Sequence, residues 1–393
     1  MRPLRIALIG AGHLGNIHAR RLAALPGFSL AAVVDPLPEH RTALAAAYHA
    51  EPLADYRPLA GKIDAAIVAT PTRFHHGIAR DLLQQGVHLL VEKPLAATAA
   101  QAWELVEAAR RAGVVLQVGH VERFNPAWTA ALPHLSEPRF ISARRQAPHA
   151  LRSTDIGVVL DLMIHDLDLA WSLNRTSVSH VRAVGQCLFG TREDLAHAEI
   201  EFANGCVASL TASRASRRVE RSMEIWCRHG QAWLDFAIPS ASLAEYGPAV
   251  QAGALDVDRM TAQARAQLKP CLLDEYAPLR QLTDAAALGS EAAQGHATDA
   301  ITAELIDLHE CIRTGRRPRV CGEQAATVLE IAERVIGAMH AAPSAARGGA
   351  WPAKPQAPLA AGTAISADAG HALAGPHFPA RIAEPPAAKR EAG

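Results

Sequence analysis

Three residues of this chain have side chains suited to proton transfer. Lys93 stands in the tripeptide Glu92-Lys93-Pro94, and Asp161 and His165 are four residues apart. A spacing of four places both side chains on one face of a helix, which we expect over about 155–173. A carboxylate beside an imidazole can hold or move a proton, and a nearby ammonium group can stabilise negative charge.

Each of these residues also has an ordinary interpretation. A lysine at a strand end is more often a solvated charge, and an aspartate on a helix is often a cap or a salt-bridge partner. Lys93, however, follows the apolar run 88–91, so we expect it at the carboxyl edge of a sheet, where open α/β folds bind ligands. Asp166 and Asp168 either orient His165 or face solvent.

A glycine-rich turn near the N-terminus indicates a bound dinucleotide. The apolar run 5–9 leads into Gly10-Ala11-Gly12-His13-Leu14-Gly15, and a helical pattern follows. The first glycine allows the tight turn, the second lets a pyrophosphate approach, and the third lets the helix pack against the sheet. We therefore expect the three glycines, with His13 and Leu14 between them, to form a phosphate site at a helix N-terminus.

An aspartate follows at the distance that this fold requires. Asp35 ends a second apolar run, 30–34, about 20 residues after the last glycine. Its carboxylate is expected to accept a hydrogen bond from a ribose 2′-hydroxyl and to repel a 2′-phosphate, which favours NAD over NADP. Arg41 leaves NADP open, because a basic side chain nearby could accept the phosphate.

Length and composition indicate a two-domain cytoplasmic enzyme. The 393 residues exceed what one core usually organises, and 39 basic residues balance 39 acidic ones, which predicts no nucleic-acid partner. No signal peptide and no membrane span of roughly 20 apolar residues is recognisable. The six cysteines show no C-x-x-C pair and are interpreted as reduced thiols, and no metal site is expected.

The pattern of the first third predicts a parallel, doubly wound sheet. Apolar strand candidates alternate with helical patterns such as 101–111, and the strand candidates are 5–9, 30–34, 65–69, 88–91 and 114–118. Beyond about residue 121, alternating strands separated by Asn204-Gly205 and His229-Gly230 predict an open antiparallel sheet. Its strand candidates are 198–202, 206–212, 222–228 and 231–236. The predicted class is thus α/β: a Rossmann domain followed by an α+β domain.

The rest of the chain is less regular. Two amphipathic helices, about 300–313 and 323–339, are expected to return to the first domain. Residues 249–296 are interpreted as a helical or irregular excursion. The tail, 342–393, is rich in Pro, Ala and Gly and is expected to be disordered. The predicted domains are therefore 1–120, 121–341 and this tail.

These motifs together resemble the glucose-fructose oxidoreductase / inositol dehydrogenase / MocA family. The resemblance covers roughly 4–340 and rests on the glycine turn, Glu92-Lys93-Pro94 and Asp161-x-x-x-His165, with the segments 69–75 and 311–315. It implies that Lys93 hydrogen-bonds the reacting hydroxyl, that His165 is the general acid/base and that Asp161 holds both. It also implies cofactor contacts by Thr70, Pro71, His75, Glu92 and Lys93.

One further segment bears on the substrate. Gly119-His120-Val121-Glu122-Arg123-Phe124-Asn125-Pro126 resembles the subgroup of this family that acts on UDP-linked N-acetylated sugars. Arg123 would suit a diphosphate, and Asn125 would suit a sugar hydroxyl or acetamido group. The alternative is that Arg123 caps the strand edge or forms an ion pair between the domains.

The resemblance implies oxidation of a secondary sugar hydroxyl by NAD, with C3 of UDP-N-acetylglucosamine as the expected position. The resulting 3-oxo sugar would serve an aminotransferase in lipid A synthesis. Two other enzymes stay open, a UDP-N-acetylglucosaminuronate dehydrogenase and an inositol or polyol dehydrogenase. A cofactor sensor without turnover is the non-enzymatic alternative. The family's open sheet implies a homodimer or homotetramer.

Overall fold

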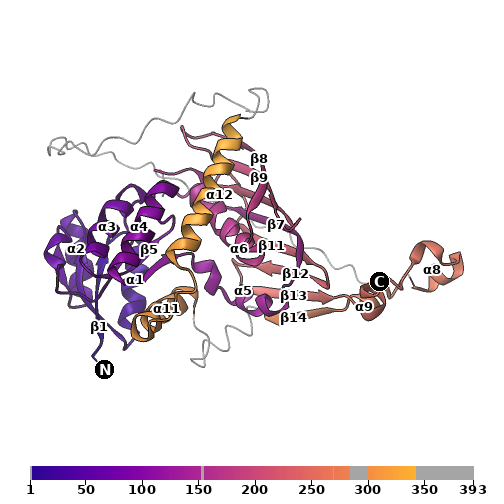
Figure 1. Cartoon of the computed structure of the whole chain (residues 1–393), viewed down its shortest axis with the longest axis horizontal. Helices are drawn as coiled ribbons and strands as arrows, with labels where there is room; N and C mark the ends of the chain where they lie inside the picture. The colour runs from indigo at the N-terminus through magenta and orange to yellow at the C-terminus, as the bar shows by residue number, and fades with distance from the viewer. Residues whose placement is uncertain (1, 152–154, 269, 284–298, 342–393) are drawn as a thin grey trace, which may run out of the picture. The chain divides into compact units, whose positions relative to one another are not determined.

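The computed structural model describes residues 2–151, 155–268, 270–283 and 299–341. Within these ranges the chain forms a six-stranded sheet and an eight-stranded sheet, which carry helices between them and around them (Figure 1). The predicted α/β class with two different sheets is confirmed. The predicted disorder of the tail concerns residues outside the described ranges.

The first sheet is entirely parallel, with the order β3-β2-β1-β4-β5-β6 that is typical of dinucleotide-binding folds. Its strands are β1 (Leu4–Ile9), β2 (Phe28–Val34), β3 (Glu51–Leu53), β4 (Ala65–Val68), β5 (His88–Glu92) and β6 (Leu116–Gly119). Both faces are covered, so the central strands are almost continuously apolar and buried. Only β3 was not anticipated, because three residues containing a proline carry no periodic pattern.

The connecting helices are α1 (His13–Ala23), α2 (Pro38–Ala47), α3 (His75–Gln84) and α4 (Ala99–Ala112), with short 3₁₀ turns at η1 (Arg57–Leu59), η2 (Thr72–Phe74) and η3 (Val121–Phe124). Local chemistry fixes the ends of α4. The Thr98 hydroxyl accepts a hydrogen bond from the Gln101 amide, and Gly113 ends the helix with a φ of +67°.

The second sheet has the order β14-β13-β12-β11-β7-β10-β9-β8. Its strands are β7 (Pro138–Gln146), β8 (Val178–Gln186), β9 (Leu195–Phe202), β10 (Val207–Ser213), β11 (Glu220–Cys227), β12 (Gly230–Asp235), β13 (Ser240–Glu245) and β14 (Leu279–Thr283). All neighbours are antiparallel except β7 and β10. Buried and more exposed residues alternate along the central strands, so the sheet has an inner face under helices and an outer face that no helix of the described ranges covers.

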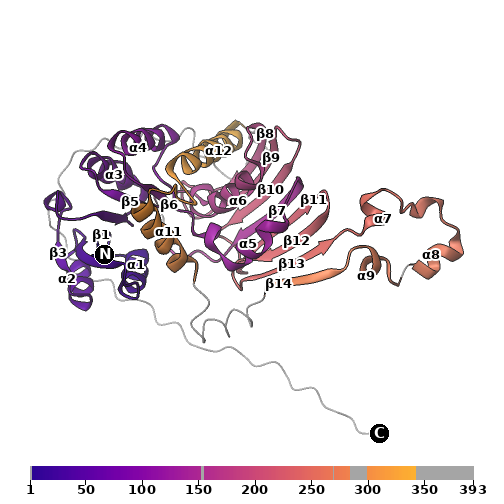
Figure 2. The same cartoon turned by 60° about the horizontal axis from the view of Figure 1, so that its bottom comes forward.

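Part of the excursion prediction was wrong. The segment 249–296 was interpreted as helical or irregular, but Leu279–Thr283 is strand β14 and pairs with β13. The connection between these two strands contains the helices α7 (Pro248–Gln251), α8 (Ala262–Leu268) and α9 (Leu272–Tyr276) and the turn η6 (Val257–Arg259) (Figure 2). β14 was missed because its residues, largely exposed, do not alternate between apolar and polar as those of a half-buried strand do.

The remaining helices cover the inner face and join the two sheets. They are α5 (Pro126–Ala131), the 3₁₀ turn η4 (Leu132–His134), the π-helical turn η5 (Val159–Met163), α6 (Ile164–Asn174), α11 (Ala300–Thr314) and α12 (Gly322–Ala341). Helix α12 packs on α4, α6 and β8, and α11 packs on α1 and η3 (Figure 1). The Glu333 carboxylate accepts a hydrogen bond from the Ala99 amide at 2.9 Å, so α12 also caps α4.

Among the described residues, no helix combines the length and the apolar character needed to cross a membrane.

Candidate active site

The turn between β1 and α1 has the geometry of a phosphate-binding loop. Gly10 has a φ of +100°, and a Cβ there would meet the Ala69 carbonyl oxygen at 2.5 Å. A Cβ on Gly15 would lie 2.0 Å from the Gly10 oxygen, whereas a Cβ on Gly12 would meet nothing within 4 Å. Helix α1 has no side-chain cap and no acidic residue in its first turn. Its N-terminal amides, beside the exposed His13 and Leu14, therefore fit a pyrophosphate.

Asp35 lies beside the position expected for the adenosine ribose of such a cofactor. It directly follows β2, and its carboxylate accepts hydrogen bonds from the Ala11 amide at 2.8 Å and the Leu37 amide at 2.9 Å. These contacts fix the carboxylate beside the glycine turn. Arg41 donates to the main-chain oxygens of Asp35 and Pro36, at 3.1 and 3.0 Å, so its guanidinium group lies on the adjoining backbone.

The loop after β4 is fastened to the loop that carries Lys93. The ring of His75 is 1% exposed and lies between two carbonyl oxygens, with Nδ1 2.9 Å from Pro94 O and Nε2 2.8 Å from Thr70 O. Burial lowers the pKa of His75. The structure thus gives His75 a positioning role next to Pro71, while the Thr70 hydroxyl is buried and has no partner within the described residues.

Glu92 points into the protein. Its Oε1 lies 2.6 Å from Nε2 of His18, which is fully buried on α1. Burial alone would raise the pKa of Glu92, but the hydrogen bond and charge of His18, with the charge of Lys93, together lower it. This contact joins β5 to α1, and the cofactor contact of Glu92 stays a prediction.

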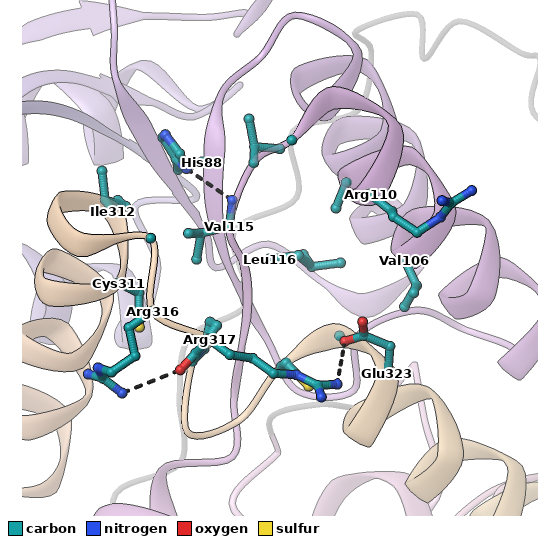
Figure 3. A pocket seen from close by; sticks show the side chains of 17 residues that line it. His88, Val106, Arg110, Val115, Leu116, Cys311, Ile312, Arg316, Arg317 and Glu323 are labelled. Carbon is teal, nitrogen blue, oxygen red and sulfur yellow. Dashed lines mark hydrogen bonds and ion pairs between the residues drawn. The ribbon is translucent and has the colours of Figure 1, made fainter.

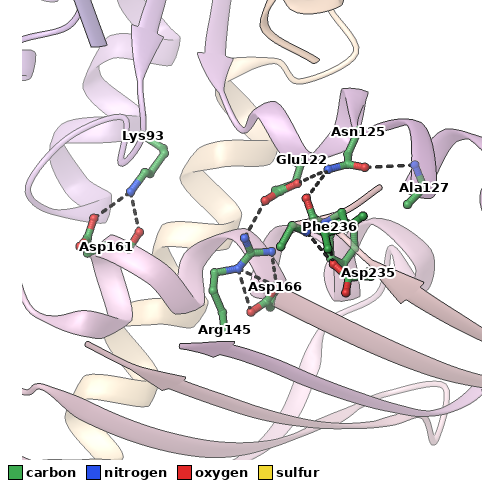
Figure 4. A network of polar contacts seen from close by, with 11 residues as sticks. Lys93, Glu122, Asn125, Ala127, Arg145, Asp161, Asp166, Asp235 and Phe236 are labelled. Carbon is green, nitrogen blue, oxygen red and sulfur yellow. Dashed lines mark hydrogen bonds and ion pairs between the residues drawn. The ribbon is translucent and has the colours of Figure 1, made fainter. Parts of the chain in front are cut away.

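Lys93 and Asp161 meet across the two domains, as Figure 4 shows. Lys93 Nζ donates to the main-chain oxygen of Asp161 at 2.5 Å and to its carboxylate at 3.1 Å. The two side chains keep 13% and 19% of their surface exposed, so the pair remains accessible. The structure therefore brings together two of the three predicted catalytic residues.

His165 lies about one turn beyond Asp161 on the same helical segment, but this segment is not the regular helix that we predicted. We expected a regular helix over 155–173, but Asp161 lies in the π-helical turn η5 and α6 begins only at Ile164. A π turn holds more residues than an α turn, so the i, i+4 argument does not apply to this pair. The carboxylate of Asp161 binds Lys93, whereas Nδ1 of His165 is buried without a partner in the described part of the chain.

The environment keeps His165 uncharged near neutral pH. Burial, and then the charge of Lys93, lower the pKa of His165 well below its ordinary value of 6.5. A neutral imidazole can accept a proton from a hydroxyl, as a general base must. The ammonium group of Lys93 lies near enough to influence that imidazole.

His120 belongs to the same site and was not assigned a role from the sequence. It directly follows β6, and the pairing of Glu92 with Gly119 shows that Lys93 and His120 each stand one residue beyond the end of one of two adjacent strands. Its ring is 1% exposed and packs edge-on against His165, with the ring centroids 6.3 Å apart. Neither ring nitrogen has a partner within the described residues, and burial lowers its pKa. The strand-end argument that located Lys93 could also have located His120.

The two predicted substrate residues have partners inside the protein. Arg123 is 6% exposed and forms a two-pronged ion pair with Asp168, at 2.7 and 3.2 Å. Asn125 is 5% exposed; it caps α5 at the Ala127 amide and donates to the Glu122 carboxylate. The ion pair of Arg123 joins η3 to α6, both within 121–341, so it resembles the alternative interpretation but does not link the two predicted domains. Because both side chains are buried and paired, we no longer expect either to contact substrate.

A buried network of charged side chains joins the second sheet to α6, the catalytic helix that carries His165. Arg145 of β7 binds Glu122 at 2.6 Å and Asp166 of α6 at 2.8 Å (Figure 4). These two carboxylates outweigh the cost of burying the guanidinium group and raise the pKa of Arg145. The network fixes α6, and hence His165, against the second sheet.

A cavity of about 570 Å³ lies elsewhere, between the end of α4, the beginnings of β5 and β6, and the beginning of α12 (Figure 3). Two of its arginines are paired with acids, Arg316 with Asp307 and Arg317 with Glu323. It lies at the amino ends of the strands, whereas ligands of open parallel sheets bind at the carboxyl ends. We therefore place the active site at Lys93, not in this cavity.

A parallel sheet with a phosphate-binding glycine turn, joined to a second sheet by a lysine, an aspartate and a histidine, defines an NAD-dependent oxidoreductase. The comparisons specify this further. Residues 4–120 match the model of the oxidoreductase family with an NAD-binding Rossmann fold, and residues 130–233 match the Gfo/Idh/MocA C-terminal domain. The chain belongs to the Gfo/Idh/MocA family, as the sequence motifs indicated.

Relatives with different substrates resemble the chain. It is 37% identical over 241 residues to UDP-N-acetylglucosamine 3-dehydrogenase of Acidithiobacillus ferrooxidans, covering 60% of this chain and 75% of the relative. It is 30% identical over 233 residues to scyllo-inositol 2-dehydrogenase (NAD⁺) of Bacillus subtilis, covering 54% and 68%. A crystal structure of the Acidithiobacillus enzyme superposes with a TM-score of 0.71 at 31% identity, over 86% of this chain and 98% of that one.

Proposed function

We propose that the protein oxidises the C3 hydroxyl of UDP-N-acetylglucosamine to a ketone, with NAD as the acceptor. The observation that carries this proposal is the 37% identity to a UDP-N-acetylglucosamine 3-dehydrogenase over 75% of that enzyme. The contact of Lys93 with Asp161, and the neutral His165 one turn away, supply the groups that such a reaction needs.

The proposed chemistry assigns one task to each side chain. NAD, held by the glycine turn and Asp35, would supply the acceptor for the hydride that leaves the carbon bearing the hydroxyl group. His165 takes the hydroxyl proton through its neutral imidazole, so that a secondary alcohol loses one hydride and one proton in total. Lys93 donates a hydrogen bond to the same oxygen and stabilises the negative charge that develops there, while Asp161 holds Lys93 in place.

The proposed product is a 3-oxo nucleotide sugar, which an aminotransferase can convert to the 3-amino sugar of a lipid A precursor. A substrate of this kind, together with NAD, would place the reaction in the cytoplasm. We also propose that the outer face of the second sheet binds a second copy of the chain, giving a homodimer or homotetramer.

A second candidate, oxidation of an inositol or another polyol, is favoured by the 30% identity to scyllo-inositol 2-dehydrogenase. A uronate form of the nucleotide sugar is a third. A cofactor sensor without turnover would have no need of the Lys93–Asp161 pair with a basic imidazole beside it.

The test is NADH formation by the purified protein with NAD and, separately, UDP-N-acetylglucosamine, its uronate and myo-inositol. An added aminotransferase with its amino donor consumes the ketone and draws the equilibrium forward. Turnover of UDP-N-acetylglucosamine in preference to the other two supports the proposal. Preferred turnover of the uronate or of inositol replaces it with that substrate, and NAD binding without turnover of any of the three favours the sensor.

A further inference from the structure

Arg221 is a charged residue on the inner face of the second sheet. It stands at the beginning of β11 and pairs in register with Arg145 of β7, whose side chain is buried under α6. Directly paired residues of antiparallel strands point to the same face, so Arg221 points to the side that carries the catalytic helix. Unlike Arg145, Arg221 is exposed.

Its neighbours show that this part of the inner face belongs to the active site. The turn η5 packs on β7 and β10, and α6 packs on the same two strands, immediately beside β11. Arg221 is one of the charges that lower the pKa of His165. The side chain therefore lies near enough to the catalytic imidazole to affect it electrostatically.

The other cations around His165 are already paired with acids. Lys93 is bound to Asp161, and Arg123 to Asp168. Arg145 is bound to both Glu122 and Asp166. Within the ranges that the structure describes, the side chain of Arg221 has neither an ion pair nor a hydrogen bond.

The residues before Arg221 add positive charge. Arg217 and Arg218 are exposed in the loop between β10 and β11, and their guanidinium groups have no acidic partner among the described residues. Glu220, the nearest acid in sequence, is on the outer face, where it accepts hydrogen bonds from Gln146 and Ser222. The start of β11 and the loop before it are therefore basic.

We infer that Arg221 binds the anionic group of the substrate, a phosphate or a carboxylate, and so selects charged sugars over neutral polyols. The inference rests on the proposed function, since it concerns the substrate of the same site. A guanidinium group suits this task because it donates two parallel hydrogen bonds to an oxyanion. A neutral polyol would leave this cation without a partner.

The test compares Arg221→Ala and Arg221→Lys with the wild type. We expect the KM for the nucleotide sugar to rise about 10- to 100-fold in Arg221→Ala, since hydrogen bonds between charged groups contribute on that scale. The kcat should change by less than about threefold, because the residue contacts a part of the substrate that does not react. Arg221→Lys should recover part of the loss.

The matched control is Arg20→Ala. Arg20 is also an exposed arginine, but it lies in the last turn of α1 and belongs to neither face of the second sheet. It should leave the KM unchanged, and unfolding curves should show that all variants fold.

Inhibition by UDP shows which anionic group of the substrate Arg221 binds. Weaker UDP inhibition of Arg221→Ala assigns Arg221 to the diphosphate. Unchanged UDP inhibition, with a raised KM for the uronate alone, assigns it to the carboxylate.

Wild-type turnover with an unchanged KM for both charged substrates in Arg221→Ala overturns the inference and leaves the proposed function standing. If the wild type turns over no nucleotide sugar, the proposed function fails, and calorimetric binding of UDP to the NAD-loaded protein still tests Arg221. In that case weaker UDP binding by Arg221→Ala supports the anion site, and equal or absent binding by both proteins overturns it.

Discussion

Lys93 contacts both the main-chain oxygen and the carboxylate of Asp161, a residue 68 positions later in the chain. The ammonium group is thereby held on the helical segment that also carries His165. Its position depends on folding of both domains, and so does the chemistry that requires it.

Replacing Lys93 with methionine keeps the length of the side chain and removes its charge. We expect kcat to fall by about 10²- to 10⁴-fold, because the developing negative charge loses its stabilising cation. Binding of NAD, followed by quenching of protein fluorescence, should persist because the glycine turn is untouched.

Lys62→Met serves as the control for this prediction, since Lys62 is an exposed lysine outside the site. Full turnover by Lys93→Met would contradict the assignment of Lys93.

The lowered pKa of His165 predicts how the activity depends on pH. The folded protein holds the pKa of His165 well below 6.5, so the imidazole stays neutral and able to accept a proton as the pH falls through 6.5. Activity is lost only when the pH falls through the lowered pKa. The acidic limb of kcat/KM, which reports on the free enzyme, should therefore lie below pH 6.5.

The same profile measured for His165→Asn should have a much lower plateau and should lack this limb. A limb at or above pH 6.5 that disappears in the variant would mean that His165 is not desolvated as described.

The sequence predicted some of these residues and missed others. Lys93 and Asp35 could be predicted because each follows an apolar strand at the carboxyl edge of the sheet, where such folds bind ligands. Arg123 and Asn125 were expected in the substrate site because a sequence does not show whether a polar side chain is exposed or buried. Arg145 was missed, because burial of a charge depends on partners from other elements.

In the turn between β1 and α1, one glycine is required by the fold and another is explained by the cofactor. Gly15 is required by the protein itself, because a Cβ there would overlap the Gly10 carbonyl. Gly12 has free space around it and a φ of −74°, which any residue can adopt. The glycine at position 12 is therefore explained by a ligand rather than by packing.

This difference predicts opposite behaviour of two variants. Gly12→Val should keep the thermal stability of the apo protein but weaken NAD binding about tenfold or more, because its side chain occupies the path of the pyrophosphate. Gly15→Ala should lower the stability by about 1–3 kcal/mol through overpacking.

Thermal unfolding with and without NAD measures both effects, and the wild type gives the reference shift. An unchanged NAD shift in Gly12→Val would contradict the phosphate assignment of this turn.

Strongly periodic elements were predicted well, and weakly patterned ones were not. Helices α4, α11 and α12 were each anticipated to within about two residues at either end. Strand β7 was missed because Arg144 and Arg145 stand together and interrupt the alternation, although one faces outward and the other is buried. The π-helical turn η5, which packs on β7 and β10, could not be foreseen, because no periodic pattern in the sequence marks it.

At the scale of the whole molecule, no helix in the described part of the chain covers the outer face of the second sheet. Phe140 and Trp226 form a register pair there, with ring centroids 5.2 Å apart and Phe140 37% exposed. An exposed aromatic pair on an open sheet suits the proposed contact between two copies.

Phe140→Glu should therefore shift the protein from an oligomer to a monomer of 41.7 kDa, as measured by light scattering after size exclusion. Leu132→Glu introduces the same charge at a similarly exposed apolar site on η4 and should not change the molar mass. A monomeric wild type would contradict the proposed assembly, and an oligomer unaffected by Phe140→Glu would place the interface elsewhere.

The way α12 caps α4 has a consequence for how such chains can recombine. The Ala99 amide at the start of α4 is bound by Glu333, and the Trp103 indole donates to Glu330, so part of the first domain is completed by residues more than 200 positions later. A gene fusion that exchanged residues 1–120 between relatives would separate these partners. Viable chimaeras should have to inherit the dinucleotide half and the closing helices from the same parent, so that natural exchange of substrate specificity is confined to the sequence between them.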